Sequence, residues 1–456
     1  CNYRDSYSII MDLRKKHPIF KYRNYDYSFK NKDLNISFDF IIEPDIEFKP
    51  TLKIKNVQNT NIDKEILENL IFNLGMIELV SYYKATCSPK IIIECGKVNK
   101  KFWKKLYLKG LGEFFFQNKI NFTQKDFLKI ECVSSKNFKK KKIKTEEKIL
   151  LPIGGGKDSI VSLNLLKGEN IYCLGLNKTK EIEKAVGKNK HIYVERKIDN
   201  KLLELNRIGY YNGHTPFSAY LAFLSMLVAY LINAKYIVLS NERSANEETT
   251  SFLNRKINHQ YSKTFEFEND FRKYTKEFLI EGIEYFSFLR PLYEIQIAQL
   301  FSKYKNYYDI FLSCNEANKT NSGTRQKTLK WCGNCPKCLF VFTILYPFMK
   351  EEDLFKIFNK NLFEDKKLKD EMLELIGVKK AKPFECVGTR KESLLGFYLS
   401  FEKAKDKNYF LLNYLNNNHY FKNIKSKKFL NALNNKNNLP KKFKKILKNE
   451  ITKLEK

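Results

Sequence analysis

Residues 148–166 read KILLPIGGGKDSIVSLNLL, and this stretch decides the fold. An apolar run over residues 149–153 stops at three consecutive glycines, and apolar residues at helical spacing follow them. The pattern predicts a strand, a tight loop and a helix. The glycines at 154–156 let backbone N–H groups close on an anion, and the helix directs its free N–H groups and positive dipole end to the same point. The stretch therefore predicts a phosphate-binding loop.

The residues after the glycines indicate which phosphate chemistry to expect. A Walker loop needs Ser or Thr directly after its Lys, whereas here Asp158 follows Lys157. The order GGGKDS instead resembles the SGGxDS signature of the PP-loop ATP pyrophosphatases, with Gly154 in place of the usual Ser. The resemblance implies that the loop binds the diphosphate of ATP through Gly154, Gly155, Gly156, Lys157 and Ser159, and that Asp158 helps to hold Mg²⁺. The alternative is a glycine-rich turn that binds nothing.

Composition limits the class of protein. A chain of 456 residues should contain at least two domains, since about 100–200 residues per domain is usual. The formal charge of +32 suggests nucleic acid as a partner, but only 11 of the 83 basic residues are Arg, and lysine is abundant throughout the chain. We expect the lysines to spread over solvated faces. We therefore expect no nucleic-acid partner.

Cysteine usage and apolar stretches indicate the compartment. Ten cysteines at irregular spacing favour a reducing compartment, and we expect the cytoplasm. The longest apolar stretch, residues 217–232, is interrupted by two serines and is shorter than the ~20 residues that a membrane span needs. We expect a buried helix there and no membrane span. A chain that begins with Cys1 is expected to have lost its original start.

The chain divides into four predicted segments. Residues 1–132 form an N-terminal α+β domain, with strands within 34–55 and 91–95 and a helix over 62–83. Residues 133–148 are polar and charged, as in a linker. The nucleotide domain covers 149–404 and includes a metal knuckle at 314–338, and a Lys- and Asn-rich helical tail covers 405–456.

Strands alternate with helices in the nucleotide domain. Strands are predicted at 149–153, 171–176, 191–197 and 234–240, which implies an α/β fold with a doubly wound parallel sheet. Ligands bind such sheets beyond the carboxyl ends of the strands. The segment NERSANE at 241–247 follows such an end and is a candidate substrate loop, with the candidate binding residues Asn241, Glu242, Arg243, Asn246 and Glu247. The alternative is an ordinary polar loop.

Three further segments carry candidate site residues. HQYSKTFEFE at 259–268 contains His259 and Lys263, and is either a site segment or a half-buried strand. In SFLRPLYEIQIAQLF, Arg290 and the following proline precede a predicted helix, as is common in PP-loop enzymes. KPFECVG at 382–388 contains Glu385 and Cys386.

Four cysteines have the spacing of metal ligands. Cys314 lies in FLSCNE, and WCGNCPKC contains Cys332, Cys335 and Cys338. Three thiolates from one knuckle and one from a preceding loop are usual in Cys₄ zinc sites. We expect structural zinc, because four thiolates leave no position for water. An iron–sulfur cluster is the second interpretation, and a disulfide or buried free thiols are the others.

The series of motifs from 149 to 390 resembles one branch of the PP-loop group, the UDP-N-acetylmuramoyl-L-alanyl-L-glutamate epimerase (MurL) family of peptidoglycan synthesis. The matching stretches are LLPIGGGKDS, SNERSANE, HQYSKTFEFE, YFSFLRPL, SCN, WCGNCPKCLFVF and KPFECVG. The resemblance implies the PP-loop (adenine nucleotide α-hydrolase-like) fold, with ATP, Mg²⁺ and a UDP-sugar dipeptide as ligands. It also implies an acyl-adenylate of the terminal L-glutamate, whose α-carbon is deprotonated and reprotonated on the other face before hydrolysis releases D-glutamate, AMP and diphosphate.

The sequence does not choose the groups that move the proton. The acid and base should lie on opposite faces of the α-carbon, with pKa values near neutral. The candidates are His214, His259, Glu385 and Cys386, each with an alternative as a packed or solvated side chain. Two other functions stay open: a nucleobase-modifying enzyme resembling 7-cyano-7-deazaguanine synthase, and a non-catalytic RNA-binding protein.

Overall fold

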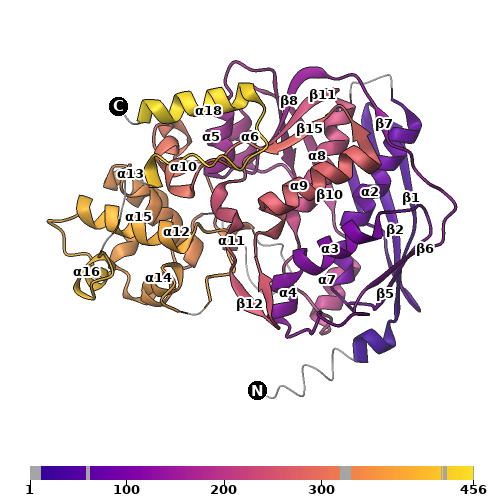
Figure 1. Ribbon diagram of the computed structural model, residues 1–456, viewed down its shortest axis with the longest axis horizontal. Helices are drawn as coiled ribbons and strands as arrows, with labels where there is room; N and C mark the ends of the chain where they lie inside the picture. The colour runs from indigo at the N-terminus through magenta and orange to yellow at the C-terminus, as the bar shows by residue number, and fades with distance from the viewer. Residues whose placement is uncertain are drawn as a thin grey trace.

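Five parallel strands form one half of a large mixed sheet in the computed structural model, which describes residues 12–57, 62–318, 330–379, 381–422, 424 and 429–454 (Figure 1). The five strands, in chain order, are β8 (Glu146–Pro152), β9 (Ile171–Leu176), β10 (Lys190–Lys197), β11 (Ala234–Leu239) and β15 (Glu284–Ser287). They lie in the spatial order β15-β11-β8-β9-β10, and every neighbouring pair is parallel. The strand order therefore reverses between β8 and β11, where doubly wound sheets bind ligands.

The N-terminal strands extend the same sheet. They are β1 (Ile19–Lys30), β2 (Asp33–Ile42), β3 (Ile46–Phe48), β4 (Thr51–Ile54), β5 (Lys90–Ile93) and β6 (Lys129–Cys132). Strand β4 pairs antiparallel with β10 and with β2, which brings the β1–β2 hairpin onto the sheet. Asn31 and Lys32 adopt positive φ at the tip of this hairpin, as tight two-residue turns require. One sheet of eleven strands therefore contains strands from both sides of the predicted linker at 133–148. The division of the chain into separate domains stays a prediction.

The predicted linker contributes two strands. Strand β7 (Lys141–Lys142) pairs with β14 (Ile280–Glu281), and β8 begins at Glu146, three residues before the expected start of the nucleotide domain. A small two-stranded sheet, β12 (Thr250–Phe252) with β13 (Arg255–Ile257), follows the predicted substrate loop.

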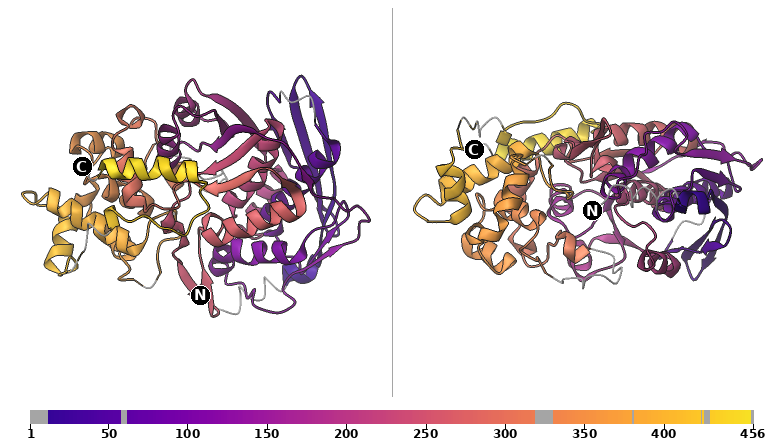
Figure 2. Two further views of the ribbon diagram at one scale, coloured as in Figure 1. Left: turned by 45° about the horizontal axis from the view of Figure 1, so that its top comes forward. Right: turned by 90° about the horizontal axis from the view of Figure 1, so that it is seen from below.

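Helices cover both faces of the five parallel strands (Figure 2). Successive side chains of β8 alternate between two hydrophobic clusters: Leu150 lies in one, and Ile149 and Leu151 lie in the other. The first cluster contains α2 (Lys64–Tyr83), α3 (Lys100–Gly110), α4 (Gly112–Gln117), α8 (Phe217–Leu231) and α9 (Phe265–Tyr274). The second contains α5 (Lys157–Leu165), α6 (Lys180–Val186), α10 (Glu294–Phe301) and α18 (Lys441–Leu454). This layering confirms a mixed α/β fold, and the PP-loop fold type stays a prediction.

A helical lobe follows the last strand and lies at the left of Figure 1. Its helices are α12 (Pro336–Leu345), α13 (Glu351–Phe358), α14 (Lys369–Leu375), α15 (Arg390–Lys403) and α16 (Phe410–Asn417). Two further short helices are α7 (Asn200–Arg207) and α11 (Asn315–Asn318). Helix α18 returns to the sheet, and its Phe443 ring packs edge-on against Tyr236 and Phe286. The expected helical tail therefore buries one apolar face on the sheet.

Several local predictions are confirmed. Asp63 caps α2, because its side chain accepts hydrogen bonds from the backbone N–H groups of Glu65 and Ile66. The apolar stretch at 217–232 is the buried helix α8. Among the described residues, no helix is both long and apolar enough to cross a membrane.

One alternative for residues 259–268 is wrong. The segment is not a strand: a 3₁₀ turn at Tyr261–Lys263 leads into α9. Thr264 caps this helix by accepting from the backbone N–H of Phe267, and Glu266 and Glu268 lie in its first turn, where negative charge is favourable. The segment is helical because this cap stabilises the first turn, although its alternating apolar residues suggested a strand.

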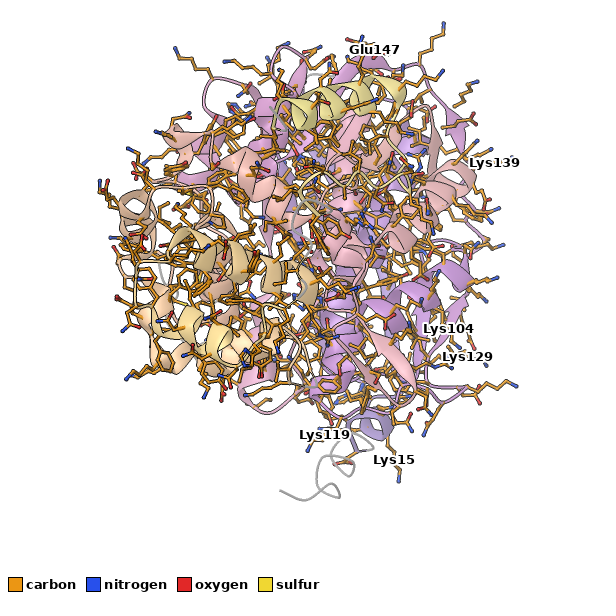
Figure 3. All side chains as sticks on the ribbon, turned by 60° about the vertical axis from the view of Figure 1, so that its left-hand side comes forward. Lys15, Lys104, Lys119, Lys129, Lys139 and Glu147 are labelled. Carbon is orange, nitrogen blue, oxygen red and sulfur yellow. The ribbon has the colours of Figure 1, made fainter. Side chains whose placement is uncertain are left out.

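Lysines project from many elements of the surface. The labelled lysines of Figure 3 come from different segments of the N-terminal part of the chain: Lys15, Lys104, Lys119, Lys129 and Lys139. Positive charge in this part is therefore not confined to one element.

Candidate active site

The glycine loop joins β8 to α5 at the point where the strand order reverses. Gly155 has φ +77°, and a Cβ at this position would lie 3.2 Å from Cβ of Glu181. A Cβ on Gly154 would meet nothing within 4 Å among the described residues, so the space beside the loop is open. The Ser159 hydroxyl donates to the Gly156 carbonyl at 3.0 Å. The loop thus presents free amides and the N-terminus of α5 to this open space.

Lys157 is buried beneath the loop between two carboxylates. Its Nζ lies 2.5 Å from Oδ1 of Asp158 and is also ion-paired with Glu294. Burial opposes the ammonium charge, but the two carboxylates outweigh this effect and raise the pKa of Lys157. Burial and the nearby charge of Asp158 raise the pKa of Glu294 to about 7. Glu294 was not predicted from the sequence, although an acidic residue in the first turn of a helix that follows a strand end is a signal for such a site.

Three carboxylates converge at this position. Oxygens of Asp158, Glu242 and Glu294 all lie within 4.8 Å of one another. Oε1 of Glu242 is buried and has no hydrogen-bond partner among the described residues, and burial raises the pKa of this carboxyl. Carboxylate oxygens are ligands that Mg²⁺ prefers. The donor set and the unpartnered oxygen fit a divalent cation.

A second cluster surrounds Cys386. Nζ of Lys263 lies 3.2 Å from its Sγ, and Nε2 of His259 lies 3.7 Å away. The other ring nitrogen of His259 contacts the carboxylate of Glu113, and Nδ1 of His214 lies 3.3 Å from the same carboxylate. The structure therefore brings together three of the candidate proton-transfer residues, His214, His259 and Cys386. Glu113, from the N-terminal segment, joins them and was not predicted from the sequence.

The electrostatics of this cluster favour a thiolate beside an imidazolium. Burial opposes the thiolate, but Lys263 and His259 outweigh it and hold the pKa of Cys386 well below its usual range. Burial also opposes the imidazolium, whereas Cys386 and Glu113 raise the pKa of His259 to about 9. Burial, with the neighbouring charge of His259, lowers the pKa of His214 well below its usual value.

Two lysines connect the loop carboxylates with the thiol. Nζ of Lys337 donates to the Cys386 carbonyl. Burial opposes the charge of Asp158, but Lys157, together with Lys337 and Lys263, lowers the pKa of this carboxyl. The backbone N–H of Lys337 donates to Oε2 of Glu385 at 2.5 Å, so Glu385 holds the start of α12. Burial raises the pKa of Glu385 to about 7. The glycine loop and Cys386 thus belong to one charged centre.

Residues of the predicted substrate loop are held by neighbouring protein groups. Nδ2 of Asn241 donates to Oγ of Ser287 at 3.2 Å, and the Arg243 guanidinium lies over the Tyr293 ring, 4.3 Å from its centroid. Oδ1 of Asn246 accepts from the backbone N–H of Phe265 at 2.8 Å.

Glu247 and Arg290 connect segments of the site. Glu247 accepts from the backbone N–H of Arg390 at 3.0 Å, which joins the substrate loop to the segment that follows Cys386. Arg290 is fully buried and donates to the carbonyls of Glu242 at 2.6 Å and Lys263 at 2.5 Å. In this structure Arg290 therefore holds in place the two loops that carry Glu242 and Lys263.

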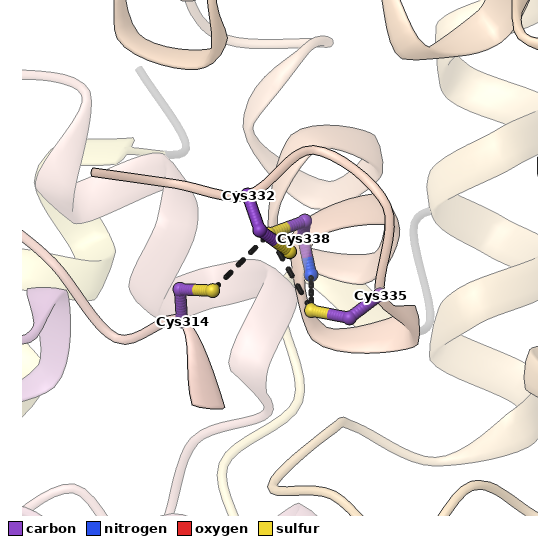
Figure 4. Close-up of side chains that lie close together, drawn as sticks. All are labelled: Cys314, Cys332, Cys335 and Cys338. Carbon is purple, nitrogen blue, oxygen red and sulfur yellow. Dashed lines mark hydrogen bonds between the residues drawn. The ribbon is translucent and has the colours of Figure 1, made fainter. Parts of the chain in front are cut away.

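The four cysteines form a compact cluster (Figure 4). Sγ of Cys338 lies 3.6 Å from that of Cys332, 3.5 Å from that of Cys335 and 3.7 Å from that of Cys314. A zinc ion with Zn–S bonds of about 2.3 Å separates its sulfurs by about 3.8 Å in a regular tetrahedron. Backbone N–H groups of Asn334 and Cys338 point at the sulfurs of Cys332 and Cys335, at 3.5 and 3.4 Å. The donor set fits one tetrahedral ion.

Two family models match the chain. The model described as the MurL N-terminal domain matches residues 11–288, and the one described as the MurL C-terminal domain matches residues 310–428. Together they cover every residue of the two charged clusters except those of the segment between them, which holds Arg290 and Glu294.

Curated relatives are similar over most of the chain, and three are named UDP-N-acetyl-alpha-D-muramoyl-L-alanyl-L-glutamate epimerase. The protein of Xanthomonas oryzae pv. oryzae is 34% identical over 328 residues, covering 70% of this chain and 72% of the relative. That of Salinispora tropica is 33% identical over 338 residues, covering 73% of each chain. That of a Micromonospora species is 33% identical over 336 residues, covering 72% and 74%. No solved structure matches the chain significantly.

Proposed function

Because the chain belongs to the MurL family, we propose that it epimerises the terminal L-glutamate of UDP-N-acetylmuramoyl-L-alanyl-L-glutamate to D-glutamate in peptidoglycan precursor synthesis. The observation that carries this proposal is the single charged centre in which Lys263 and Lys337 join the glycine loop to Cys386. Such a centre can activate a carboxylate and move a proton at the adjacent carbon without transferring the substrate between sites.

ATP activates the glutamate in the proposed reaction. The open space beside Gly154 and the free amides at the start of α5 support diphosphate binding, and the loop lies at the reversal of the strand order. A substrate carboxylate attacks the α-phosphorus, diphosphate leaves, and an acyl-adenylate forms. Ser159 would bind the leaving diphosphate, and Lys157 adds positive charge beneath the loop.

Magnesium would be held by Asp158, Glu242 and Glu294, whose oxygens converge beside the loop. When bound, the ion supplies positive charge against the phosphates of ATP. Lys157 neutralises two of these carboxylates and keeps them together for this purpose.

Cys386 is the proposed acid–base group on one face of the α-carbon. Its thiolate is held by Lys263 at 3.2 Å and by His259 at 3.7 Å, so it is available as a base at neutral pH. A second group must return the proton on the opposite face, because one side chain cannot reach both faces of a bound carbon.

Zinc is the proposed occupant of the cysteine cluster. Sulfur separations of 3.5–3.7 Å support one tetrahedral ion, whereas the thiolates of an iron–sulfur cluster bind separate irons. Four thiolates complete its coordination, so this site has a structural role: it fixes α12, which carries Lys337.

The test is to incubate the protein with ATP, Mg²⁺ and UDP-N-acetylmuramoyl-L-alanyl-L-glutamate in D₂O and to analyse the hydrolysed product on a chiral column. We expect D-glutamate with deuterium at the α-carbon, and AMP with diphosphate. Formation of ADP and phosphate would refute adenylation, and product without deuterium would refute the proton-transfer route. Cys386→Ser should stop epimerisation while leaving diphosphate release.

A further inference from the structure

A carboxylate from the N-terminal segment reaches the thiol centre. Glu113 lies in α4, its side chain is 7% exposed, and Oε2 contacts Nδ1 of His259. The same oxygen lies 3.3 Å from Nδ1 of His214, and Oε1 accepts from Nε2 of Gln117 at 2.9 Å. Both oxygens of this buried carboxylate are therefore engaged, and the shortest contact is with His259.

Helix α4 is fixed against both segments that form the centre. The ring of Phe116 lies 5.1 Å from that of Phe384, two residues before Cys386. At the start of the same helix, a Cβ on Gly112 would lie 3.4 Å from the side chain of Ile257, two residues before His259. The position of Glu113 relative to His259 and Cys386 is thus set by packing on two sides.

We propose that Glu113 is a positioning residue that holds His259 and Cys386 as an imidazolium–thiolate pair, which gives the N-terminal segment a direct part in the reaction. The role in catalysis rests on the proposed function. A carboxylate on Nδ1 fixes the tautomer and ring orientation of a histidine, so that Nε2 faces the sulfur. The order Glu113, His259, Cys386 has this connectivity.

The charges around the three residues are consistent with this assignment. Lys263 and Lys337 contact Cys386. His214 and Lys84 neighbour the Glu113 carboxylate. Burial lowers the pKa of Lys84 to about 8, and burial also keeps His214 neutral. Among the described groups, Cys386 and Glu113 are the negative partners that raise the pKa of His259 against burial.

The experiment is the pH dependence of alkylation of Cys386 by iodoacetamide, with the modified peptide quantified by mass spectrometry. It uses the full chain and needs neither ATP nor substrate. In the wild type the rate should be nearly constant from pH 6 to 8, because the thiolate is already formed. In Glu113→Gln, followed from about pH 4 to pH 8, the imidazolium loses a partner, so the thiol pKa should rise by a unit or more and the rate should fall about tenfold at each pH below the new pKa.

Glu131→Gln is the matched control, since Glu131 lies in the same segment but pairs with Lys90 at 2.7 Å on strand β5. Its profile should equal that of the wild type. A folded Glu113→Gln chain with a wild-type profile would overturn the proposal. If that variant fails to fold, the wild-type profile still tests the proposal. An ordinary thiol titration near pH 8.5 would show that His259 and Cys386 do not form an imidazolium–thiolate pair. Absence of epimerisation in the wild type would refute the proposed function separately and would leave the alkylation result intact.

Discussion

Replacement of Lys263 by Met should raise the pKa of Cys386 and shift the pH dependence of the reaction. Nζ of Lys263 lies 3.2 Å from Sγ of Cys386. At an effective dielectric constant of about 20, two unit charges at this separation interact by about 5 kcal/mol, which corresponds to between three and four pKa units. Water will screen part of this loss because both side chains are partly exposed, so we expect a rise of about 2 units.

Two measurements check this shift. The midpoint of the alkylation profile of Cys386 should move up by about 2 pH units, because the lost charge favoured the deprotonated form. Epimerisation should follow the same profile. Lys263→Arg keeps the charge and should stay near the wild type, and Lys256→Met, which removes a lysine paired with exposed Glu248, should change neither measurement. A folded Lys263→Met chain whose alkylation midpoint stays at the wild-type value would refute the electrostatic reasoning.

Three further predictions address the loop and the cysteines. Asp158→Asn should lower both epimerisation and diphosphate release by about 100-fold, about 2.7 kcal/mol of barrier; loss of epimerisation alone would contradict its place at the nucleotide. Purified protein should contain about one zinc per chain, and Cys335→Ser should lower metal content and thermal stability together, whereas Cys132→Ser should leave the metal content unchanged. Gly155→Ala should destabilise the protein by about 1 kcal/mol or more in thermal or denaturant unfolding, because φ is +77° and its Cβ would lie 3.2 Å from a neighbouring side chain; unchanged stability would mean that the loop relaxes freely.

Local sequence patterns predicted much of the fold. The apolar strands at 171–176 and 234–239 and the helix from Phe217 to Leu231 lie where the periodicity placed them, because each pattern reports the burial of its own element. The glycine loop was predictable because the residues that meet its backbone requirement are adjacent in the sequence. The segment at 259–268 was ambiguous, since its alternating aromatics fitted a strand and only the cap at Thr264 favoured a helix.

Non-local pairing was not predictable from one sequence. Strand β4 pairs with β10, about 140 residues later, and no local signal specifies that the N-terminal strands join the central sheet. The same limit applies to the site. Glu113 lies in a short helix for which no prediction was made, and its approach to His259 depends on packing between segments 146 residues apart. The motif containing Cys386 and its partners His259 and Lys263 were predicted, but Glu113 and Lys337 were not.

The order of the proposed steps follows from the charge of the centre. A free carboxylate beside the α-carbon would place its negative charge next to a developing carbanion, and adenylation removes that charge before the proton is taken. Lys263 connects the two events, because it stabilises the Cys386 thiolate and its positive charge also helps to lower the pKa of Asp158 at the glycine loop. Arg290 holds the Lys263 carbonyl and the Glu242 carbonyl from one buried guanidinium, so the two parts of the centre cannot move apart independently. The geometry thus favours activation and proton transfer on a substrate that stays in one place.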